Sequence, residues 1–317
     1  MRAIVTGGAG FIGSRLVGHL RGAGWTVTVI DRATGPSIEG YPQLPADCDV
    51  IFHLASPVGP VGVLGQAGRI VPQVVETTEI VSQWARHYRC PLIDVSTSEV
   101  YGSGGTDTES DSCHFRAAPS ARKEYGVAKL AAETMLLNTS GLDVRIVRPF
   151  NVAGPGQKPD GGFVLPRFIA QAEAHLPLTV YQPGTQRRAF THVDDIVEGL
   201  VAVYERGRSG EVYNLGNPDN ETTIVKLAEI VNNLTGNPAG YDIVDPTTIH
   251  GPAFREAPEK LPNARKALVE LGWQPTRGIY HTVSDALLPD RTDWPTFVPT
   301  ERGLEVETVL PAHLERR

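Results

Sequence analysis

Cysteine is scarce in this sequence, and basic charge is not in excess. The three cysteines among the 317 residues, Cys48, Cys90 and Cys113, are too few for a disulfide framework and too scattered for a Cys-x-x-Cys pair. We therefore expect a cytoplasmic protein with reduced thiols. Lys and Arg number 29 against 36 Asp and Glu, a net charge of −7, and no basic run stands out. This balance argues against nucleic acid and anionic membranes as partners.

Long apolar runs and metal or hydrolase motifs are absent as well. Gly, Pro or a charged residue interrupts every apolar stretch before the roughly 18 to 20 residues that span a bilayer, so no membrane segment is expected. The first residues enter a short apolar strand and lack the cleavage site of an export signal. None of the nine histidines stands at a metal-ligand spacing. No Gly-x-Ser-x-Gly elbow follows a strand. We predict neither a metal site nor a serine hydrolase.

The sequence does contain a regular alternation of short β-rich runs and longer helical patterns. Hydrophobic residues make up 41% and charged residues 21%, as in folded globular proteins. Apolar runs rich in Val and Ile predict strands at 2–6, 26–30, 50–54, 92–96 and 144–148, and helical spacing fills 11–23, 71–88 and 125–138. Strands that alternate with helices predict an α/β fold with a Rossmann-type, doubly wound parallel sheet.

The pattern changes after Asn151, where loops rich in Gly and Pro begin. Further runs predict helices at 165–174, 193–205, 223–234 and 263–271 and strands at 178–181 and 212–215. Because the strand at 212–215 would return to the first sheet, we expect two interleaved domains. The larger comprises 1–152 and 186–216, and the smaller comprises 153–185 and 217–286. The tail, 287–317, shows no clear periodicity, and we expect it on the surface or partly mobile.

A glycine-rich segment lies between the first predicted strand and helix. Gly7, Gly10 and Gly13 have a spacing that permits a tight turn and close approach of a pyrophosphate to the backbone. Asp31 stands 18 residues after Gly13, at the end of the next predicted strand, where a carboxylate can bind ribose hydroxyls. The combination predicts a dinucleotide site. The charge of Asp31 favours NAD over NADP, with Arg32 leaving NADP as the alternative.

Tyr125 and Lys129 lie four residues apart on one predicted helix, so their side chains project from the same face. A nearby ammonium stabilises phenolate, and we expect it to lower the pKa of Tyr125 toward neutrality. Together with the dinucleotide loop, the pair predicts acid–base catalysis at a sugar hydroxyl rather than an ordinary amphipathic helix.

The hydroxyl-rich run 96–102 follows another predicted strand, at the edge of the sheet where ligands bind in open α/β folds. Thr97 or Ser98 can donate a hydrogen bond to an oxygen that becomes a ketone. Glu99 adds a carboxylate that simple oxidation does not require, which suggests further chemistry. The alternative is a hydroxyl-rich turn with a solvated acid.

Together these residues resemble the extended short-chain dehydrogenase/reductase family, in its nucleotide-sugar epimerase/dehydratase branch. The resemblance covers most of the chain and is strongest to UDP-glucuronate decarboxylases (UDP-xylose synthases). It is carried by His-Leu-Ala-Ser-Pro at 53–57, the run 96–102, Gln-Arg-Arg-Ala-Phe at 186–190 and Asn-Leu-Gly-Asn-Pro at 214–218. A 4-epimerase typically has a plainer hydroxyl run at the second segment and Arg-Asp-Phe at the third.

The resemblance implies NAD as cofactor, a UDP-sugar as substrate and a homodimer joined through helices 71–88 and 125–138. The reacting sugar would be surrounded by Thr97, Ser98, Glu99, Tyr125 and Lys129. The NAD site, in the larger domain, would comprise Gly7, Gly10, Phe11, Ile12, Gly13, Asp31, Arg32, Leu54 and Ala55. The nucleotide-sugar site, in the smaller domain, would comprise Asn151, Arg167, Tyr181, Arg188 and Lys260.

The chain departs from the decarboxylases at two basic positions. Phe163 stands where they have an Arg, with Arg167 four residues on, and Lys260 stands where they carry an Arg implicated in gripping the substrate. Lys keeps the charge but loses the two-pronged geometry of a guanidinium. Arg255 lies close in sequence and is an alternative. The segment between Asp31 and His53 is also shorter than in relatives, which weakens the expected contacts to adenine.

The implied reaction is oxidation at carbon 4 of UDP-glucuronate and loss of carbon dioxide from the 4-keto acid. The product would be UDP-4-keto-xylose, UDP-xylose or both. The alternatives are a UDP-sugar 4-epimerase and a 4,6-dehydratase in which Glu99 handles the proton at carbon 5. A redox-sensing binding protein that had lost catalysis would be expected to lack the pair Tyr125 and Lys129.

Overall fold

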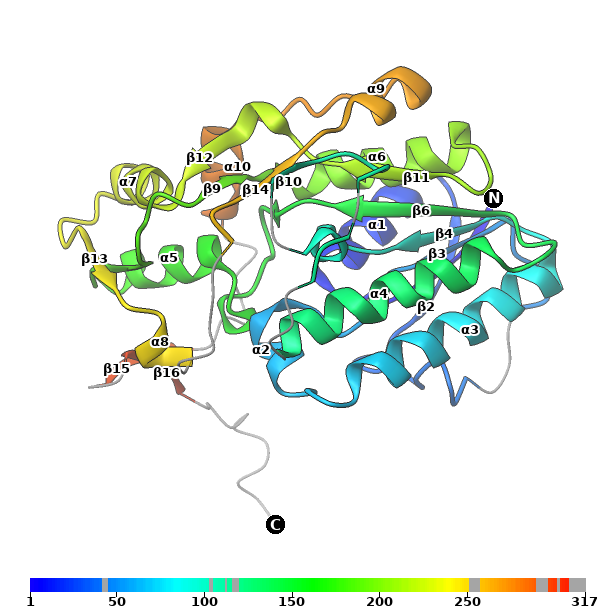
Figure 1. The fold of residues 1–317 in the computed structure, drawn as a ribbon, viewed down its shortest axis with the longest axis horizontal. Helices are drawn as coiled ribbons and strands as arrows, with labels where there is room; N and C mark the ends of the chain where they lie inside the picture. Colours follow the sequence, from blue (N-terminus) through cyan, green and yellow to red (C-terminus); the bar gives the residue numbers. More distant parts are fainter. Residues whose placement is uncertain are drawn as a thin grey trace, which may run out of the picture.

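A six-stranded parallel sheet forms the centre of the computed structural model (Figure 1), which describes residues 1–41, 45–102, 105–111, 113–115, 120–250, 257–288, 296–300 and 303–307. Its strands lie in the order β11 (Val212–Leu215), β6 (Val144–Pro149), β4 (Leu92–Val95), β3 (Val50–His53), β1 (Arg2–Thr6) and β2 (Thr26–Ile30). All five pairings are parallel. The predicted doubly wound parallel sheet is confirmed.

Helices cover both faces of this sheet because its strands are apolar on both sides. The helices α1 (Phe11–Gly22), α6 (Val193–Arg206) and α9 (Arg265–Leu271) pack on one face, in a core that includes Val5, Phe52 and Val95. On the other face, α3 (Ile70–Tyr88) and α4 (Ala121–Leu137) enclose Ile4, Ile51 and Leu92. These core residues alternate along each strand, as the two-residue period of a strand requires. Figure 1 shows α3 and α4 side by side along this second face.

A smaller region lies beside the sheet, at the left in Figure 1. It contains α5 (Val164–Glu173), α7 (Ile224–Thr235), α8 (Thr247–His250) and α10 (Ile279–Ala286). Residues of α5, α7 and α10 form a separate core that includes Phe168, Leu227 and Val283. Short strands complete the region, with β13 (Tyr241–Val244) parallel to β8 (Leu178–Tyr181) and β10 (Thr191–His192) parallel to β7 (Val152–Ala153).

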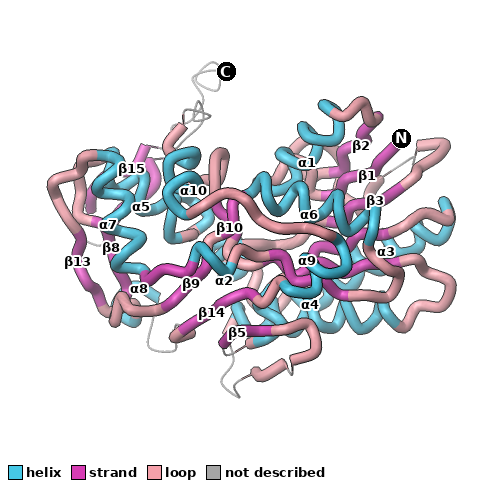
Figure 2. Tube along the Cα trace, turned by 90° about the horizontal axis from the view of Figure 1, so that it is seen from above, coloured by secondary structure: helices cyan, strands magenta, loops and turns pink. Residues whose placement is uncertain are grey.

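One four-stranded sheet joins segments that are far apart in the sequence. Its order is β12 (Glu221–Thr223), β9 (Arg187–Ala189), β14 (Glu259–Pro262) and β5 (Gly105–Asp107). In Figure 2 the strands β9, β14 and β5 are next to one another. Because β14 lies between β9 and β5, it connects the first half of the chain to the smaller region.

Several short elements have no counterpart among the predicted ones. They are β5, β7, β9, β10, β12, β13, β14, α2 (Gly59–Leu64), α8, α10 and the 3-10 turns η1 (Ser98–Tyr101), η2 (Pro159–Gly161) and η3 (Pro218–Asn220). Most have two to four residues, too few for a hydrophobic period to show. The proposed domain boundaries stay a prediction. Most of the tail and Arg255 lie outside the described residues, and the described part of the tail includes the hairpin β15 (Thr296–Thr300) and β16 (Gly303–Glu307).

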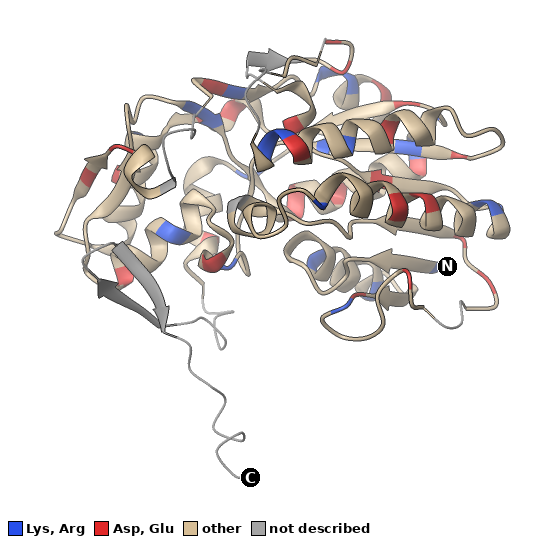
Figure 3. Ribbon diagram, turned by 60° about the horizontal axis from the view of Figure 1, so that its bottom comes forward, with Lys and Arg blue, Asp and Glu red and all other residues tan. Residues whose placement is uncertain are grey.

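Charged residues of both signs are interspersed over the outer helices in Figure 3. Within the described part of the chain, no helix combines the length and the apolar character needed to cross a membrane. In the same residues, no group of three or more His, Cys, Asp or Glu side chains is arranged to hold a metal ion.

Candidate active site

The glycine loop leads from β1 into α1 and leaves no room for a side chain at Gly7 or Gly13. Gly7 has a left-handed φ of 70°, and a Cβ there would lie 2.7 Å from the backbone nitrogen of Ala55. A Cβ at Gly13 would lie 2.1 Å from the carbonyl oxygen of Gly7. Gly10 is the N-cap of α1 and provides no side-chain cap for the first N–H groups of the helix. This geometry fits a pyrophosphate at the helix N-terminus.

Asp31 directly follows β2 and is tied to the glycine loop. Its carboxylate accepts hydrogen bonds from the backbone N–H of Ala9 at 3.0 Å and of Ala33 at 2.9 Å. An ionised carboxylate has about four acceptor positions, so it retains capacity for ribose hydroxyls. Arg32 is exposed beside it.

The remaining residues predicted for the cofactor site border the same loop. Phe11 and Ile12 begin α1, and Leu54 and Ala55 follow β3. The N–H of Leu54 donates to the carbonyl of Thr6 at 3.1 Å, which holds this backbone against the glycine loop. The residues predicted for NAD are thus gathered at the carboxyl edge of β1, β2 and β3, and they fit a dinucleotide.

Tyr125 and Lys129 lie on α4 and are both buried, at 7% and 1% exposure. Lys129 Nζ donates to the carbonyl oxygen of Val95 at 2.9 Å. Burial raises the pKa of the Tyr125 phenol above its ordinary value, and the charge of Glu99 adds to this, while the hydroxyls of Thr97 and Ser56 act in the opposite direction. The expected lowering of the Tyr125 pKa was therefore wrong for the chain itself.

Lys129 does not produce the expected effect because it is itself desolvated. Burial lowers the pKa of its ammonium, and the carboxylates of Asp94 and Glu133 oppose that shift. The ammonium of Lys129 therefore lies near two acids beneath α4, and it donates its hydrogen bond to a carbonyl of β4.

Glu99 begins the 3-10 turn η1 together with Ser98, and Thr97 caps that turn by accepting the N–H of Glu99 at 3.2 Å. Its carboxylate lies between two cations. Arg122 of α4 donates to it at 2.7 and 3.0 Å, and Lys260 of β14 donates at 2.5 Å. Burial would raise the pKa of Glu99, but the charges of Lys260 and Arg122 hold it well below its ordinary range.

Arg122 is the residue that the sequence reasoning missed. A signal was present, because Arg122 precedes Tyr125 by three residues and the two positions share one helix face. Lys260, in contrast, was predicted at the sugar site. The structure brings it to Glu99 across 161 residues of sequence, and its side chain is 2% exposed.

The other residues predicted to bind the nucleotide sugar divide into two groups. Asn151, whose φ of 37° is left-handed, donates to the carbonyls of Ala189 at 3.3 Å and Lys260 at 3.4 Å. Arg188 on β9 is the register partner of Lys260 and donates to the carbonyl of Ala257 at 2.9 Å. These residues therefore border the pair of Lys260 and Glu99.

Arg167 and Tyr181 form the second group. The guanidinium of Arg167 lies 4.4 Å from the ring centre of Tyr181 and donates to its hydroxyl at 2.9 Å. Their role in the nucleotide-sugar site stays a prediction.

Comparison with known proteins identifies the family of this chain. Residues 3–216 match the NAD dependent epimerase/dehydratase family, so the chain belongs to that family and NAD is its cofactor. The chain is 34% identical to UDP-glucuronic acid decarboxylase 1 of Arabidopsis thaliana, over 90% of this chain and 69% of that protein. It is 32% identical to UDP-N-acetyl-alpha-D-glucosaminuronate decarboxylase of Bacillus cytotoxicus, over 84% of this chain and 90% of that protein.

A solved structure is also similar throughout. UDP-glucuronic acid 4-epimerase of Bacillus cereus, in complex with UDP-glucuronic acid and NAD, has a TM-score of 0.78 and 26% identity. The alignment covers 90% of this chain and 98% of that one. The Rossmann-type fold and the predicted family are confirmed.

Proposed function

We propose that this chain is an NAD-dependent UDP-glucuronate decarboxylase. The observation that carries the proposal is the pair of cations, Lys260 and Arg122, that hold a carboxylate beside the buried phenol of Tyr125. Such cations suit a sugar acid, because a uronate carboxylate can make the same charged hydrogen bonds as Glu99. The decarboxylase relatives support this assignment.

The residues around Glu99 and Tyr125 would divide the chemistry between them. When bound against the glycine loop, NAD supplies a hydride acceptor and a positive ring charge for the oxidation at carbon 4. Tyr125 would take the proton of the 4-hydroxyl as carbon 4 becomes a ketone. The carboxylate is then β to a ketone, so its C–C bond breaks, carbon dioxide leaves, and the electron pair forms an enolate.

The polar turn after β4 would stabilise that enolate. Thr97 or Ser98 would donate a hydrogen bond to the developing oxyanion at carbon 4. Glu99, held by Lys260 and Arg122, would orient the water or the sugar ring at carbon 5, where a proton must be added. Arg188 and Asn151 would hold the UDP part, with Arg188 contributing its charge to the diphosphate.

One incubation in deuterium oxide tests the proposal. A decarboxylase acting on UDP-glucuronate with added NAD should release carbon dioxide and give a pentose product with one deuterium at carbon 5, because that proton comes from solvent. Mass spectrometry reports the lost carboxyl group and proton NMR the position of the label. The assignment fails if UDP-glucuronate releases no carbon dioxide while another UDP-sugar is turned over.

The second candidate is a UDP-sugar 4-epimerase, which the similarity to the epimerase structure favours. An epimerase would keep every carbon atom and gain no carbon-bound deuterium, since the bond at carbon 5 stays intact. A 4,6-dehydratase would keep six carbons, lose water and could take up deuterium at carbon 5. The same incubation therefore separates all three reactions.

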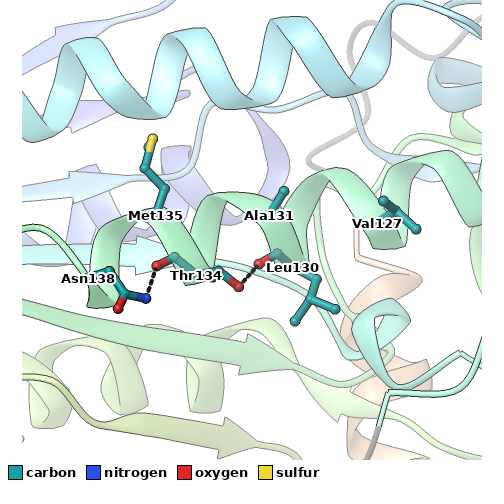
Figure 4. A pocket seen from close by; sticks show the side chains of 6 residues that line it. All are labelled: Val127, Leu130, Ala131, Thr134, Met135 and Asn138. Atoms are coloured by element: carbon teal, nitrogen blue, oxygen red, sulfur yellow. Dashed lines mark hydrogen bonds between the residues drawn. The ribbon is translucent and has the colours of Figure 1, made fainter.

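We further propose a homodimer joined through α3 and α4. The outer face of α4 is apolar and hollowed where Val127, Leu130, Ala131, Thr134, Met135 and Asn138 line it (Figure 4). An exposed apolar face of this kind is typical of an interface. Light scattering should give the mass of a dimer for the wild type and of a monomer for Ala131→Arg.

We further propose a cytoplasmic location, because Cys48, Cys90 and Cys113 form no disulfide among the described residues and reduced cysteines persist there. Cell fractionation checks that proposal.

A further inference from the structure

A row of buried polar side chains crosses the central sheet beneath α4. This polar row consists of Thr6, His53, Asp94, Ser96, Arg148 and Asn214, and each member is at most 6% exposed. The register places Thr6 beside His53 and His53 beside Asp94, while Arg148 stands beside Asn214. The row therefore spans β1, β3, β4, β6 and β11 at their carboxyl ends.

The polar row lies on the face that α3 and α4 cover. The residues two positions earlier on β1, β3, β4 and β6 are Ile4, Ile51, Leu92 and Ile146, and all four belong to the core under these helices. Side chains two apart on a strand point to the same side. Lys129 and Glu133, on the inner face of α4, are therefore the helix side chains that meet the row.

Most members of the polar row have hydrogen-bond partners. His53 shares a 2.7 Å hydrogen bond with the hydroxyl of Thr6. Ser96 donates to Glu133, and Arg148 donates to Glu133 at 3.0 and 2.5 Å. Such pairing is the rule for buried polar groups.

Asp94 is the exception in the polar row. It is 1% exposed, and neither of its carboxylate oxygens accepts a hydrogen bond within the described residues. Burying an unpaired carboxylate is costly, and an apolar residue of similar size would fit the neighbouring core without that cost. The position therefore carries a disadvantage for stability that packing does not explain.

The charges around Asp94 connect it to the two catalytic candidates. From α4 it faces Lys129 and Glu133, and its charge also acts on Tyr125. Lys129 donates to the carbonyl of Val95, the next residue along β4, so the ammonium lies against this strand.

From β3 the neighbour is His53, whose pKa burial lowers to about 3, with the charge of Lys129 adding to the effect. His53 is thus neutral at neutral pH. From β6, Arg148 is engaged by Glu133. Lys129 is the cation that acts directly on Asp94, and it partly offsets the burial that raises the pKa of Asp94 to about 6.

We propose that Asp94 is a positioning residue that places a negative charge under Lys129 and so sets the pH range in which Tyr125 and Lys129 work. The inference rests on the proposed catalytic function of that pair. A negative charge favours the protonated forms of both neighbours: it keeps the buried lysine an ammonium and delays ionisation of the phenol. Protonation of the Asp94 carboxylate at low pH would remove this influence.

The substitution Asp94→Asn tests the proposal because it keeps the shape and removes the charge. Without the negative charge, the pKa values of Tyr125 and Lys129 both fall. We expect the pH profile of turnover to move to lower pH by about one unit, the usual size of an effect from one nearby charge. Asp49→Asn is the matched control, since Asp49 is an exposed acid before β3 that accepts the N–H of Arg2.

A second measurement does not depend on turnover. Because the pKa of Asp94 is raised in the folded protein, the folded state holds more protons than the unfolded chain between the ordinary value of 3.8 and about 6. The contribution of Asp94 to stability therefore falls as pH rises through this window. Above pH 6, the variant Asp94→Asn should melt at a higher temperature than the wild type. This difference in melting temperature should shrink toward pH 4.

The two measurements together decide the role of Asp94. A displaced profile together with a raised melting temperature near neutral pH supports the proposal. An unchanged profile overturns it, as does a melting temperature that drops equally at all pH values, which indicates a structural role. If UDP-glucuronate is not turned over, the profile is measured with the UDP-sugar that is, so the failure of the proposed function stays separate from the failure of this inference.

Discussion

The pKa values of Glu99, whose side chain is 22% exposed, and of Asp94, which is 1% exposed, move in opposite directions in two neighbouring regions of this protein. At the carboxyl edge of the sheet, Glu99 lies between Lys260 and Arg122, and its pKa is held low. Inside the sheet, Asp94 has no hydrogen-bond donor among the described residues, and its pKa is raised to about 6. Desolvation raises the pKa of both acids, so the two cations beside Glu99 account for the difference.

The substitution Lys260→Met would weaken this contrast, because it would leave Glu99 with Arg122 as its one remaining cation of the pair. Losing one partner of a buried ion pair costs about 3 kcal/mol of stability. Because the low pKa of Glu99 stabilises the fold above its ordinary value of 4.5 and this contribution is lost as pH falls, the loss should be largest at neutral pH. Unfolding in denaturant at several pH values measures it.

The control for this prediction is Lys226→Met, which breaks the exposed pair of Lys226 and Glu229. An exposed pair contributes at most about 1 kcal/mol. Equal losses in the two variants would show that Glu99 does not depend on Lys260.

The substitution Tyr125→Phe removes the group on which both acids act. Turnover should fall by about 100-fold or more, because the phenol is the proposed proton acceptor, while NAD binding should persist. Single-turnover assays and calorimetry measure the two properties. Tyr280→Phe, at an exposed tyrosine of α10, is the control. Near-normal turnover in Tyr125→Phe would assign proton removal to another group.

The substitution Arg188→Ala extends the comparison from acids to a buried cation. Arg188 is 7% exposed and donates to backbone carbonyls of Ala257 and Arg187. If it binds the diphosphate, UDP itself should bind more weakly by roughly 1.5 to 3 kcal/mol, as expected for a lost charged hydrogen bond.

The neighbour Arg187 gives a matched control for that titration. Its side chain is 47% exposed and pairs with Glu221 and Glu259, so Arg187→Ala should leave UDP affinity unchanged in calorimetry. An equal loss of UDP affinity in both variants, or no loss in either, would contradict the assignment of Arg188 to the diphosphate.

Asp31→Ala extends the comparison to an acid near solvent and should have the smallest effect. The wild type should bind NAD more tightly than NADP, because a carboxylate repels the 2′-phosphate. The variant should lose about 1 kcal/mol of that preference, as calorimetry with each cofactor can measure. Arg32→Ala should not strengthen NADP binding. Tighter NADP binding by the wild type would contradict the cofactor assignment made from Asp31.

The sequence predicted the central fold well because each of its elements carries a local signal. The strands at 2–6 and 26–30 agree with β1 and β2, and the glycine spacing predicted the turn that joins β1 to α1. These features depend on residues that are close together in the chain. The hydrophobic period and the turn-forming residues of such a segment can be recognised in the sequence. The motifs that carry the family resemblance are equally local, and the match to the family confirmed the prediction made from them.

The parts that were missed depend on contacts between distant residues. The salt bridge from Lys260 to Glu99 joins β14 to η1, and no pattern in either segment indicates the other. The pKa direction of Tyr125 was wrong because the sequence shows a lysine four residues away but not the burial of both side chains. The sequence shows Asp94 as a single acid in an apolar strand. Only the pairing register of the sheet revealed the polar row around it.

The position of β14 has a consequence for the synthesis of this protein. Because β14 lies between β9 and β5, a nascent chain that ends before Glu259 leaves both neighbours without their shared partner strand. The parallel six-stranded sheet, whose last strand ends at Leu215, can be complete before that point. Pairing β14 with the distant strand β5 closes a long loop, and this step is slow compared with local helix formation. The six parallel strands can therefore pair on the ribosome, whereas β14 and the sheet-covering helix α9 both come from the last fifth of the chain, so premature termination there should abolish turnover.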